Sequence, residues 1–328
     1  YTSAQGDAGV RQTIADNLVK RFSLPAKADL IYMTCGAAAS LCITIRSLVS
    51  EGCNEFAVQA PFFPEYKVFV ESMGGNLTVV PADTDKFELN IEEFKKAINE
   101  KTQGVIINSP NNPTGRIYSE SNIKALADAL TEHGNKTGRF PYIICDEPYR
   151  AITYGNSKVA SVFPVYRNSV VVTSFAKNLS VPGERIGYIA VNPNCDDSAL
   201  LVSACVLCTR ILGFVNAPAF FQKVIAKSWN ASCDYSLYEK RRNEIMSVMD
   251  YAGLKYAEPE GAFYLFVKVP EGWNDDDMAF CEHLKKFNIL CAPGSGFAGK
   301  GWFRIAYCVS ESTILNSKDA FKKAVESK

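Results

Sequence analysis

The sequence predicts an α/β protein with a mainly parallel sheet covered by helices, followed by a smaller α+β region. Between Gly36 and about Thr173, short β-branched runs alternate with helical patterns, which is typical of a parallel sheet built from βαβ units. The runs near residues 104, 142 and 170 start roughly 30 to 40 residues apart, the length of one such unit. After about residue 225, long amphipathic helices with few strands predominate, which indicates a change of architecture.

The pattern places the elements in a definite order. An amphipathic helix that includes Asp7 and Ala15 opens the chain, and a second helix follows the small residues at 34–40. Strands are expected at residues 55–59, 77–80, 104–107, 142–145 and 170–173. In the second region we expect helices over residues 235–252 and 273–287 and strands at 263–267 and 303–307. The change of pattern divides the chain into a large domain, residues 1–225, and a small domain, residues 226–328.

Composition excludes several classes of partner. The chain has 328 residues, 35 Lys and Arg against 35 Asp and Glu, and a net charge of zero, so no overall field favours nucleic acid or an acidic membrane. No apolar run approaches the ~20 residues that a membrane-spanning helix needs. The chain begins at Tyr1, close to a helix. We therefore expect a preceding segment, with any targeting signal it carries.

The cysteines and histidines predict no metal site. Eleven cysteines, most in apolar runs, indicate reduced thiols and a cytoplasmic protein. Cys205 and Cys208 form a CxxC pair, but their apolar surroundings favour core packing over a redox or metal role. The two histidines, His133 and His283, stand beside charged residues, so we expect both at the surface and neither in a hydrolase triad.

Polar residues follow the predicted strands, where the carboxyl ends of parallel strands meet at one ligand-binding edge. Asn112 lies in a turn after residue 107, Asp146 follows residue 145, and Ser174 and Lys177 follow residue 173. Burying Asp146 is costly without a cationic partner, so we expect one. Small residues at 34–40 open a helix whose first N–H groups suit a phosphate, although their spacing matches neither a Walker loop nor a GxGxxG fingerprint.

Six motifs stand in one order along nearly the whole chain. They are PFFPEY at 61–66, NNPTG at 111–115, DEPY at 146–149, SxxK at 174–177 with Arg185 and Gly187, PGS at 293–295 and RIA at 304–306. In these motifs the sequence resembles the class I/II pyridoxal-phosphate-dependent aminotransferases of the aspartate aminotransferase fold, fold type I. The resemblance implies a mainly parallel, seven-stranded sheet and the cofactor pyridoxal 5′-phosphate.

The resemblance also implies the residues that act on the cofactor. Lys177 matches the lysine that forms a Schiff base with the aldehyde and then moves a proton. Asp146 matches the carboxylate that keeps the ring nitrogen protonated. Asn112 and Tyr149 match the donors to the ring oxygen O3′, although Asn112 also suits a turn-stabilising role.

Further positions match the contacts to the ring face and the phosphate. Phe63 matches the aromatic residue stacked on the ring, with a core aromatic as the alternative. Ser174 and Arg185 match the phosphate-binding side chains. The backbone N–H groups expected to join them belong to Gly36, Ala37 and Ala38. Because alanine has no hydroxyl, the main chain must supply more of this binding than in many relatives.

The resemblance implies that three further residues bind the substrate or reach a neighbouring subunit. Arg304 matches the arginine that binds the substrate α-carboxylate together with Asn112, with a structural salt bridge as the alternative. Arg210 lies near the family arginine that reads a second carboxylate across a dimer, but its spacing to Asn216 is one residue longer. Tyr1 aligns with a tyrosine that reaches the neighbouring subunit's phosphate. The implied assembly is a homodimer with active sites at its interface.

The implied function is transfer of an amino group from an L-amino acid, with aspartate or glutamate favoured, to a 2-oxo acid. Two alternatives use the same scaffold. One is a pyridoxal-phosphate-dependent C–S lyase or decarboxylase. The other is a ligand-sensing regulator that has no enzymatic activity and carries a DNA-binding module outside this sequence.

Overall fold

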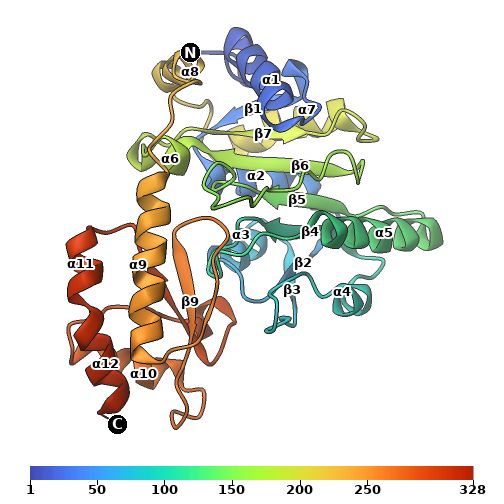
Figure 1. The fold of residues 1–328 in the computed structure, drawn as a ribbon. Coiled ribbons are helices and arrows are strands. Elements are labelled where there is room, and N and C mark those ends of the chain that lie inside the picture. The colour runs from blue at the N-terminus through green and yellow to red at the C-terminus, as the bar shows by residue number, and fades with distance from the viewer. Residues whose placement is uncertain (328) are drawn as a thin grey trace.

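A computed structural model describes residues 1–327, and its largest element is a seven-stranded sheet (Figure 1). The strand order is β1-β7-β6-β5-β4-β2-β3, and β7 runs antiparallel to both of its neighbours. This is the predicted mainly parallel sheet. Its strands are β1 (Ile31–Thr34), β2 (Glu55–Gln59), β3 (Asn76–Val80), β4 (Thr102–Asn108), β5 (Tyr142–Asp146), β6 (Ser169–Ser174) and β7 (Gly187–Val191).

The five predicted strands are present as β2 to β6, each with bounds within two residues of the prediction. The pattern missed β1 and β7. A βαβ unit places a long helix between strands, whereas β7 follows β6 after the short α6 (Phe175–Asn178) and the 3-10 helix η2 (Pro182–Glu184). The βαβ spacing that predicted the parallel strands therefore could not predict the antiparallel strand β7.

Helices cover both faces of the sheet. Along β4, Ile107 packs toward α1 and α5, whereas Ile106 packs toward α2 and α7, as the alternation of strand side chains requires. Two apolar cores result, one on each face. The helices of this part are α1 (Ala8–Phe22), α2 (Ala37–Leu48), α3 (Glu65–Ser72), α4 (Ile91–Ala97), α5 (Glu120–Thr137), α7 (Ser198–Ile211) and α8 (Ala219–Lys227), with the 3-10 helix η1 (Ala28–Leu30).

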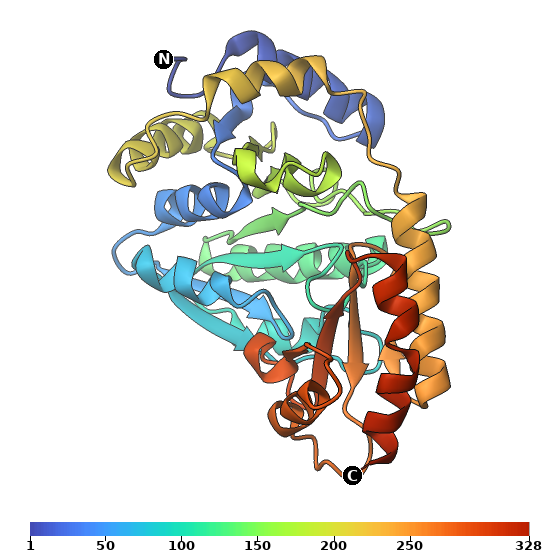
Figure 2. The ribbon, with the colours of Figure 1, turned by 90° about the vertical axis from the view of Figure 1, so that its left-hand side faces the viewer.

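The C-terminal part is a smaller α+β unit with its own antiparallel sheet, in the order β10-β11-β9-β8. Figures 1 and 2 both show α9 and α12 side by side along this unit. Its elements are α9 (Ser236–Ala252), β8 (Tyr256–Ala257), β9 (Tyr264–Lys268), α10 (Asp277–Lys285), β10 (Ala292–Pro293), η3 (Gly294–Phe297), β11 (Trp302–Ala306), α11 (Glu311–Asn316) and α12 (Lys318–Glu326).

Side-chain caps set the starts of several helices. Asp276 accepts a hydrogen bond from the backbone N–H of Ala279 at 2.9 Å, so α10 begins at residue 277 and not near residue 273 as predicted. Asp7 caps α1 in the same way through the N–H of Val10, at 3.1 Å. In contrast, α2 begins after Gly36, which has no side chain to cap it. The first N–H groups of α2 therefore remain available to a ligand.

The histidines are less exposed than the sequence suggested. Both His133 and His283 are half-buried, so the prediction of two surface histidines is wrong. The ring of His283 packs against Trp273 and Phe287, with centroids 5.0 and 5.2 Å apart. The reason is that one face of α10 packs into the C-terminal core, where His283 Nε2 lies 3.0 Å from the carbonyl oxygen of Ala324.

The cysteines are all free thiols, and Cys205 and Cys208 lie on the buried side of α7, in the core, as predicted. Within residues 1–327, no group of three or more His, Cys, Asp and Glu side chains is arranged to hold a metal ion. None of the helices described there combines the length and the apolar character needed to cross a membrane.

Two glycines allow the start of β7 to meet the start of α2. A Cβ atom on Gly187 would lie 2.3 Å from the carbonyl oxygen of Thr173 and 2.9 Å from the Cα of Gly36. Both neighbours are backbone atoms and cannot move aside cheaply. Glycine at residue 187 thus permits a contact that places α2 beside β6 and β7.

We expect Gly187→Ala to lower the free energy of unfolding by about 2 kcal/mol or more, because overpacking against backbone strains the sheet. Urea denaturation followed by circular dichroism measures this loss. Gly183→Ala is the matched control, since an added Cβ there meets no atom within 4 Å. Equal stabilities for the two variants would contradict the packing argument.

Candidate active site

A cavity of about 330 Å³ lies between the carboxyl-end edge of the large sheet and the C-terminal unit. It brings together most of the residues that the sequence singled out. Those lining it are Ala37, Ala38, Phe63, Asn112, Asp146, Tyr149, Ser174, Lys177, Arg185 and Arg304. Gly36 stands immediately before the α2 residues of this set.

Asp146 ends β5 and is buried. Tyr66 Oη donates to Asp146 Oδ2 at 2.6 Å, whereas no residue in the described chain offers a hydrogen bond to Oδ1. Burial raises the pKa of Asp146 to about 7; the Tyr66 hydrogen bond opposes this rise and the nearby charge of Glu147 adds to it. Within residues 1–327 no side chain supplies the expected cationic partner, and Oδ1 remains available to a donor in the cavity.

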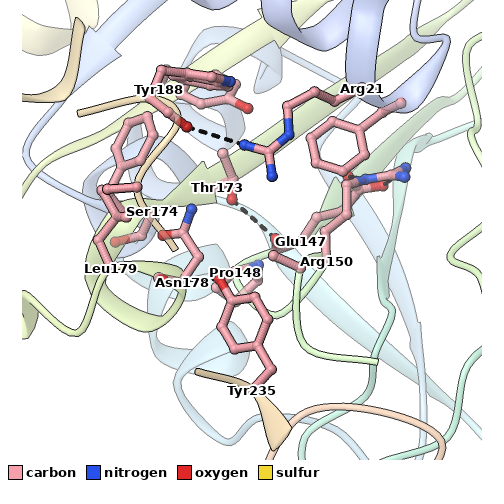
Figure 3. A pocket seen from close by; sticks show the side chains of 15 residues that line it. Arg21, Glu147, Pro148, Arg150, Thr173, Ser174, Asn178, Leu179, Tyr188 and Tyr235 are labelled. Carbon is pink, nitrogen blue, oxygen red and sulfur yellow. Dashed lines mark hydrogen bonds and ion pairs between the residues drawn. The ribbon is translucent and has the colours of Figure 1, made fainter. Parts of the chain in front are cut away.

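The neighbouring carboxylate, Glu147, lies in a second, smaller cavity of about 50 Å³, where it stands beside Arg150 (Figure 3). Arg150 Nη2 donates to Glu147 Oε1 at 3.0 Å, and the Cys145 thiol donates to the same oxygen at 3.1 Å. Glu147 is therefore a paired structural ion. Of these two consecutive acids, Asp146 alone has an oxygen without a partner within residues 1–327.

Two asparagines connect strands β4 and β5 to the opposite wall of the cavity. Asn108 Nδ2 donates to the carbonyl oxygen of Asp146 at 2.9 Å, and Asn108 Oδ1 accepts from the N–H of Asn112 at 2.7 Å. The Asn112 side chain accepts from Arg304 Nη1 at 2.8 Å. The turn-stabilising role considered for Asn112 belongs to Asn111, whose Oδ1 accepts from the N–H of Thr114 at 3.1 Å.

Lys177 lies in α6, directly after β6, and is half-buried. Burial lowers the pKa of the Lys177 amine; the positive charges of Arg185 and Arg304 act in the same direction, and Cys308 opposes them. Ser174 caps α6, since its hydroxyl accepts from the N–H of Ala176 at 3.0 Å. The short helix therefore fixes an amine of reduced basicity at the cavity wall.

One end of the cavity suits an anion. The start of α2 presents Ala37 and Ala38 there, and the positive end of the helix dipole favours negative charge. Arg185 packs against Gly36, where an added Cβ would lie 3.0 Å from Arg185 Nη2. A helix start and a guanidinium group thus converge without a side chain between them.

Arg304 approaches the cavity from β11 of the small sheet. Its guanidinium carbon lies 4.6 Å from the ring centroids of both Tyr264 and Phe297. Nη1 is used by Asn112, while Nε is buried and finds no acceptor in residues 1–327. Within residues 1–327 no ion pair includes Arg304; it is a cation over two aromatic rings with a free donor, which suits a carboxylate ligand.

The sequence analysis missed three residues of this site. Tyr66 donates a hydrogen bond to Asp146, and Asn108 accepts one from the N–H of Asn112. Tyr264 Oη lies 2.9 Å from Tyr149 Oη. Tyr66 ends the PFFPEY motif and Asn108 follows a predicted strand directly, so both positions carried a signal. Tyr264 lay in a predicted strand, but only the pairing of Tyr264 with Ala306 brings it beside Arg304.

Apart from Gly36, which directly precedes the lining residues of α2, two predicted residues are not among the described residues that line this cavity. Tyr1 is fully exposed at the start of the chain, and Arg210 is exposed in the last turn of α7. The resemblance assigns both to the site of a neighbouring subunit.

Sequence comparisons agree with this geometry. A family model described as aminotransferase class I and II matches residues 1–320. The probable aspartate/prephenate aminotransferase of Aquifex aeolicus is 29% identical, over 99% of this chain and 83% of its own length. The aspartate aminotransferase of Thermotoga maritima is 28% identical, over 100% of this chain and 84% of its own length.

Solved structures give the same result. An amino transferase from Eubacterium rectale has a TM-score of 0.96 and 45% identity, covering 99% of this chain and 81% of that one. The aromatic aminotransferase of Pyrococcus horikoshii has a TM-score of 0.89 and 26% identity, covering 99% and 87%. Because the family model spans nearly the whole sequence, this chain belongs to the class I and II aminotransferases, which use pyridoxal 5′-phosphate.

Proposed function

We propose that this chain forms a homodimeric aminotransferase that moves an amino group from an L-amino acid of the aspartate or glutamate type to a 2-oxo acid. One observation carries the proposal. The cavity contains an amine of lowered pKa, Lys177, a buried carboxylate with a free oxygen, Asp146, and a stacked guanidinium with a free donor, Arg304. These are the groups that an amino acid and its cofactor require.

The cavity fits pyridoxal 5′-phosphate at both ends. Asp146 Oδ1 suits the protonated nitrogen of the pyridine ring, because a positive N–H donor offsets the cost of burying the carboxylate. Arg185, Ser174 and the N–H groups of Gly36, Ala37 and Ala38 suit the phosphate. We assign the cofactor to this cavity because one end suits its ring nitrogen and the other suits its phosphate.

Further contacts to the ring follow from the same placement. Asn112 and Tyr149 are proposed donors to O3′, and Phe63 is proposed to stack on the ring. Phe63 is only partly buried and meets Tyr66 edge-on, with centroids 5.6 Å apart. This exposure to the cavity favours stacking over the alternative of a core aromatic residue.

Lys177 and Arg304 divide the work on the substrate. When bound, the cofactor supplies a conjugated ring that accepts the electron pair left as Cα loses its proton. Lys177 Nζ would hold the aldehyde group of the cofactor and, when free, would take the proton from the substrate Cα. Arg304 binds the α-carboxylate with its free donors and, with Asn112, orients Cα toward Lys177.

An exposed apolar surface supports the dimer. Leu200, Leu207 and Ile211 of α7 are 68%, 60% and 60% exposed and recur on one side of the helix, and Phe220 of α8 is 72% exposed. Exposed apolar side chains gathered on one side of a helix favour contact with another protein surface. Arg210 belongs to the same stretch, so this interface would carry it toward a neighbouring active site, where it would read a second carboxylate.

We also propose a role for Tyr1, a division into domains and a cellular location. Tyr1, fully exposed, would reach the phosphate of the neighbouring subunit. The proposed division into domains 1–225 and 226–328 falls inside the last turn of α8, shortly before the connecting residues 228–235. A cytoplasmic location is supported by the free thiols of all eleven cysteines.

The proposed reaction predicts a defined pattern of products. Aspartate with 2-oxoglutarate should give oxaloacetate and glutamate, and the purified enzyme loaded with cofactor should change its absorbance on addition of either amino acid alone. A panel of amino acids and oxo acids, analysed by chromatography, measures this. Pyruvate and ammonia released from cystathionine without an oxo acid would indicate the C–S lyase instead, and no turnover of any amino acid would favour the sensor.

Lys177→Ala should reduce transamination by roughly a thousandfold or more, because the proton acceptor at Cα is lost. Borohydride reduction followed by mass spectrometry should attach the cofactor to the Lys177 peptide of the wild type and not to the variant. Lys158→Ala, at an exposed lysine, is the control and should retain both properties. An active Lys177→Ala variant would contradict the assignment.

Asp146→Asn should weaken cofactor retention yet stabilise the cofactor-free protein. The folded-state pKa of about 7 lies above the ordinary value of 3.8, so the folded chain keeps a proton that the unfolded chain releases. The stability of the wild type therefore falls as pH rises through this window and is level above it.

Thermal unfolding of both cofactor-free proteins between about pH 5 and about pH 8 measures this difference. The advantage of Asp146→Asn over the wild type should grow up to about pH 7 and then stay constant. Asp85→Asn, at an exposed position, is the control and should show no such trend. A constant difference across this range would refute the burial argument.

A further inference from the structure

Tyr264 of β9 contacts two proposed functional groups at once. Its hydroxyl oxygen lies 2.9 Å from Tyr149 Oη, and its ring centroid lies 4.6 Å from the guanidinium carbon of Arg304. Tyr264 is 7% exposed and lines the cavity. The antiparallel pairing of β9 with β11, which sets Tyr264 opposite Ala306, holds it beside Arg304.

The hydroxyl contact has a direction once Tyr149 is engaged. Burial raises the pKa of both phenols, most strongly that of Tyr149, so each hydroxyl keeps its single proton at neutral pH. A hydroxyl that donates its proton can still accept a hydrogen bond. If Tyr149 donates to O3′ of the cofactor, its oxygen accepts from Tyr264, and the chain of two hydrogen bonds strengthens the first.

The ring contact restrains Arg304. The guanidinium carbon lies over the rings of both Tyr264 and Phe297, and Asn112 accepts from Nη1. Contact with two rings limits movement of the planar group, so its free donors keep one orientation before a carboxylate arrives. Preorganisation of this kind lowers the cost of binding.

We propose that Tyr264 is a positioning residue for both halves of the site: its hydroxyl orients Tyr149 toward the cofactor, and its ring orients Arg304 toward the substrate α-carboxylate. The inference rests on the proposed function of the cavity. It adds a link between the cofactor side, built by the large sheet, and the substrate side, built by the small sheet.

Two substitutions in the cofactor-loaded enzyme separate the two roles. Tyr264→Phe keeps the ring and loses the hydroxyl, so the absorbance spectrum should move part of the way toward that of Tyr149→Phe, with succinate affinity within about twofold of the wild type. Tyr264→Leu loses both contacts, so succinate, an unreactive dicarboxylate, should also bind roughly fivefold more weakly.

Tyr307→Phe is the matched control. Tyr307 Oη donates to Tyr154 Oη at 3.1 Å, and Tyr307 is likewise buried in the core of the small sheet but does not border this cavity. This variant should keep the wild-type spectrum and succinate affinity. Circular dichroism checks that each protein is folded, and Tyr264→Phe decides the hydroxyl role by itself if Tyr264→Leu is unstable.

A wild-type spectrum for Tyr264→Phe, or wild-type succinate affinity for a folded Tyr264→Leu, would overturn the proposal. The same changes in Tyr307→Phe would also overturn it, because they would show a general effect of losing a buried phenol. Neither readout needs turnover. Failure of the aminotransferase proposal, seen as no amino transfer by the wild type, is therefore distinct from failure of this inference.

Discussion

The buried carboxylate of Asp146 has one oxygen for which the described part of the chain supplies no partner. Much of the site is arranged around this constraint. The end of β5 fixes the backbone, Tyr66 satisfies the other oxygen, and Arg150 neutralises the adjacent Glu147. A protein that buries such a group at a cost to its own stability gains by it only when a complementary cation arrives. Pyridoxal 5′-phosphate, the family's cofactor, brings such a cation in its protonated ring.

The parallel strands made much of this predictable. Asp146 and Lys177 follow consecutive strands, β5 and β6, so their place at one sheet edge follows from sequence order and the rule for parallel strands. Gly36 was recognised from the small residues that open α2. The antiparallel β7 was not predicted because no helix of normal length precedes it. The predicted helix over residues 273–287 began before the true start of α10 because the cap at Asp276 was not recognised.

The opposite wall was harder to predict. Arg304 was predicted from its motif, but its contact with the rings of Tyr264 and Phe297 depends on the register of β9 and β11 and on the course of η3. Likewise, Tyr66 and Asp146 are 80 residues apart in the chain. Contacts of this kind arise from tertiary packing, which local patterns do not encode. The histidines illustrate the same point, since charged neighbours suggested exposure while packing of α10 buried one face of the ring of His283.

The two walls of the cavity belong to different sheets. Asp146, Arg185 and the start of α2 all belong to the large sheet, whereas Arg304 and Tyr264 belong to the small one and meet it through single hydrogen bonds to Asn112 and Tyr149. The two sets of contacts are therefore separable: a change confined to the small sheet would disturb Arg304 and Tyr264 while Asp146, Arg185 and the start of α2 keep their places.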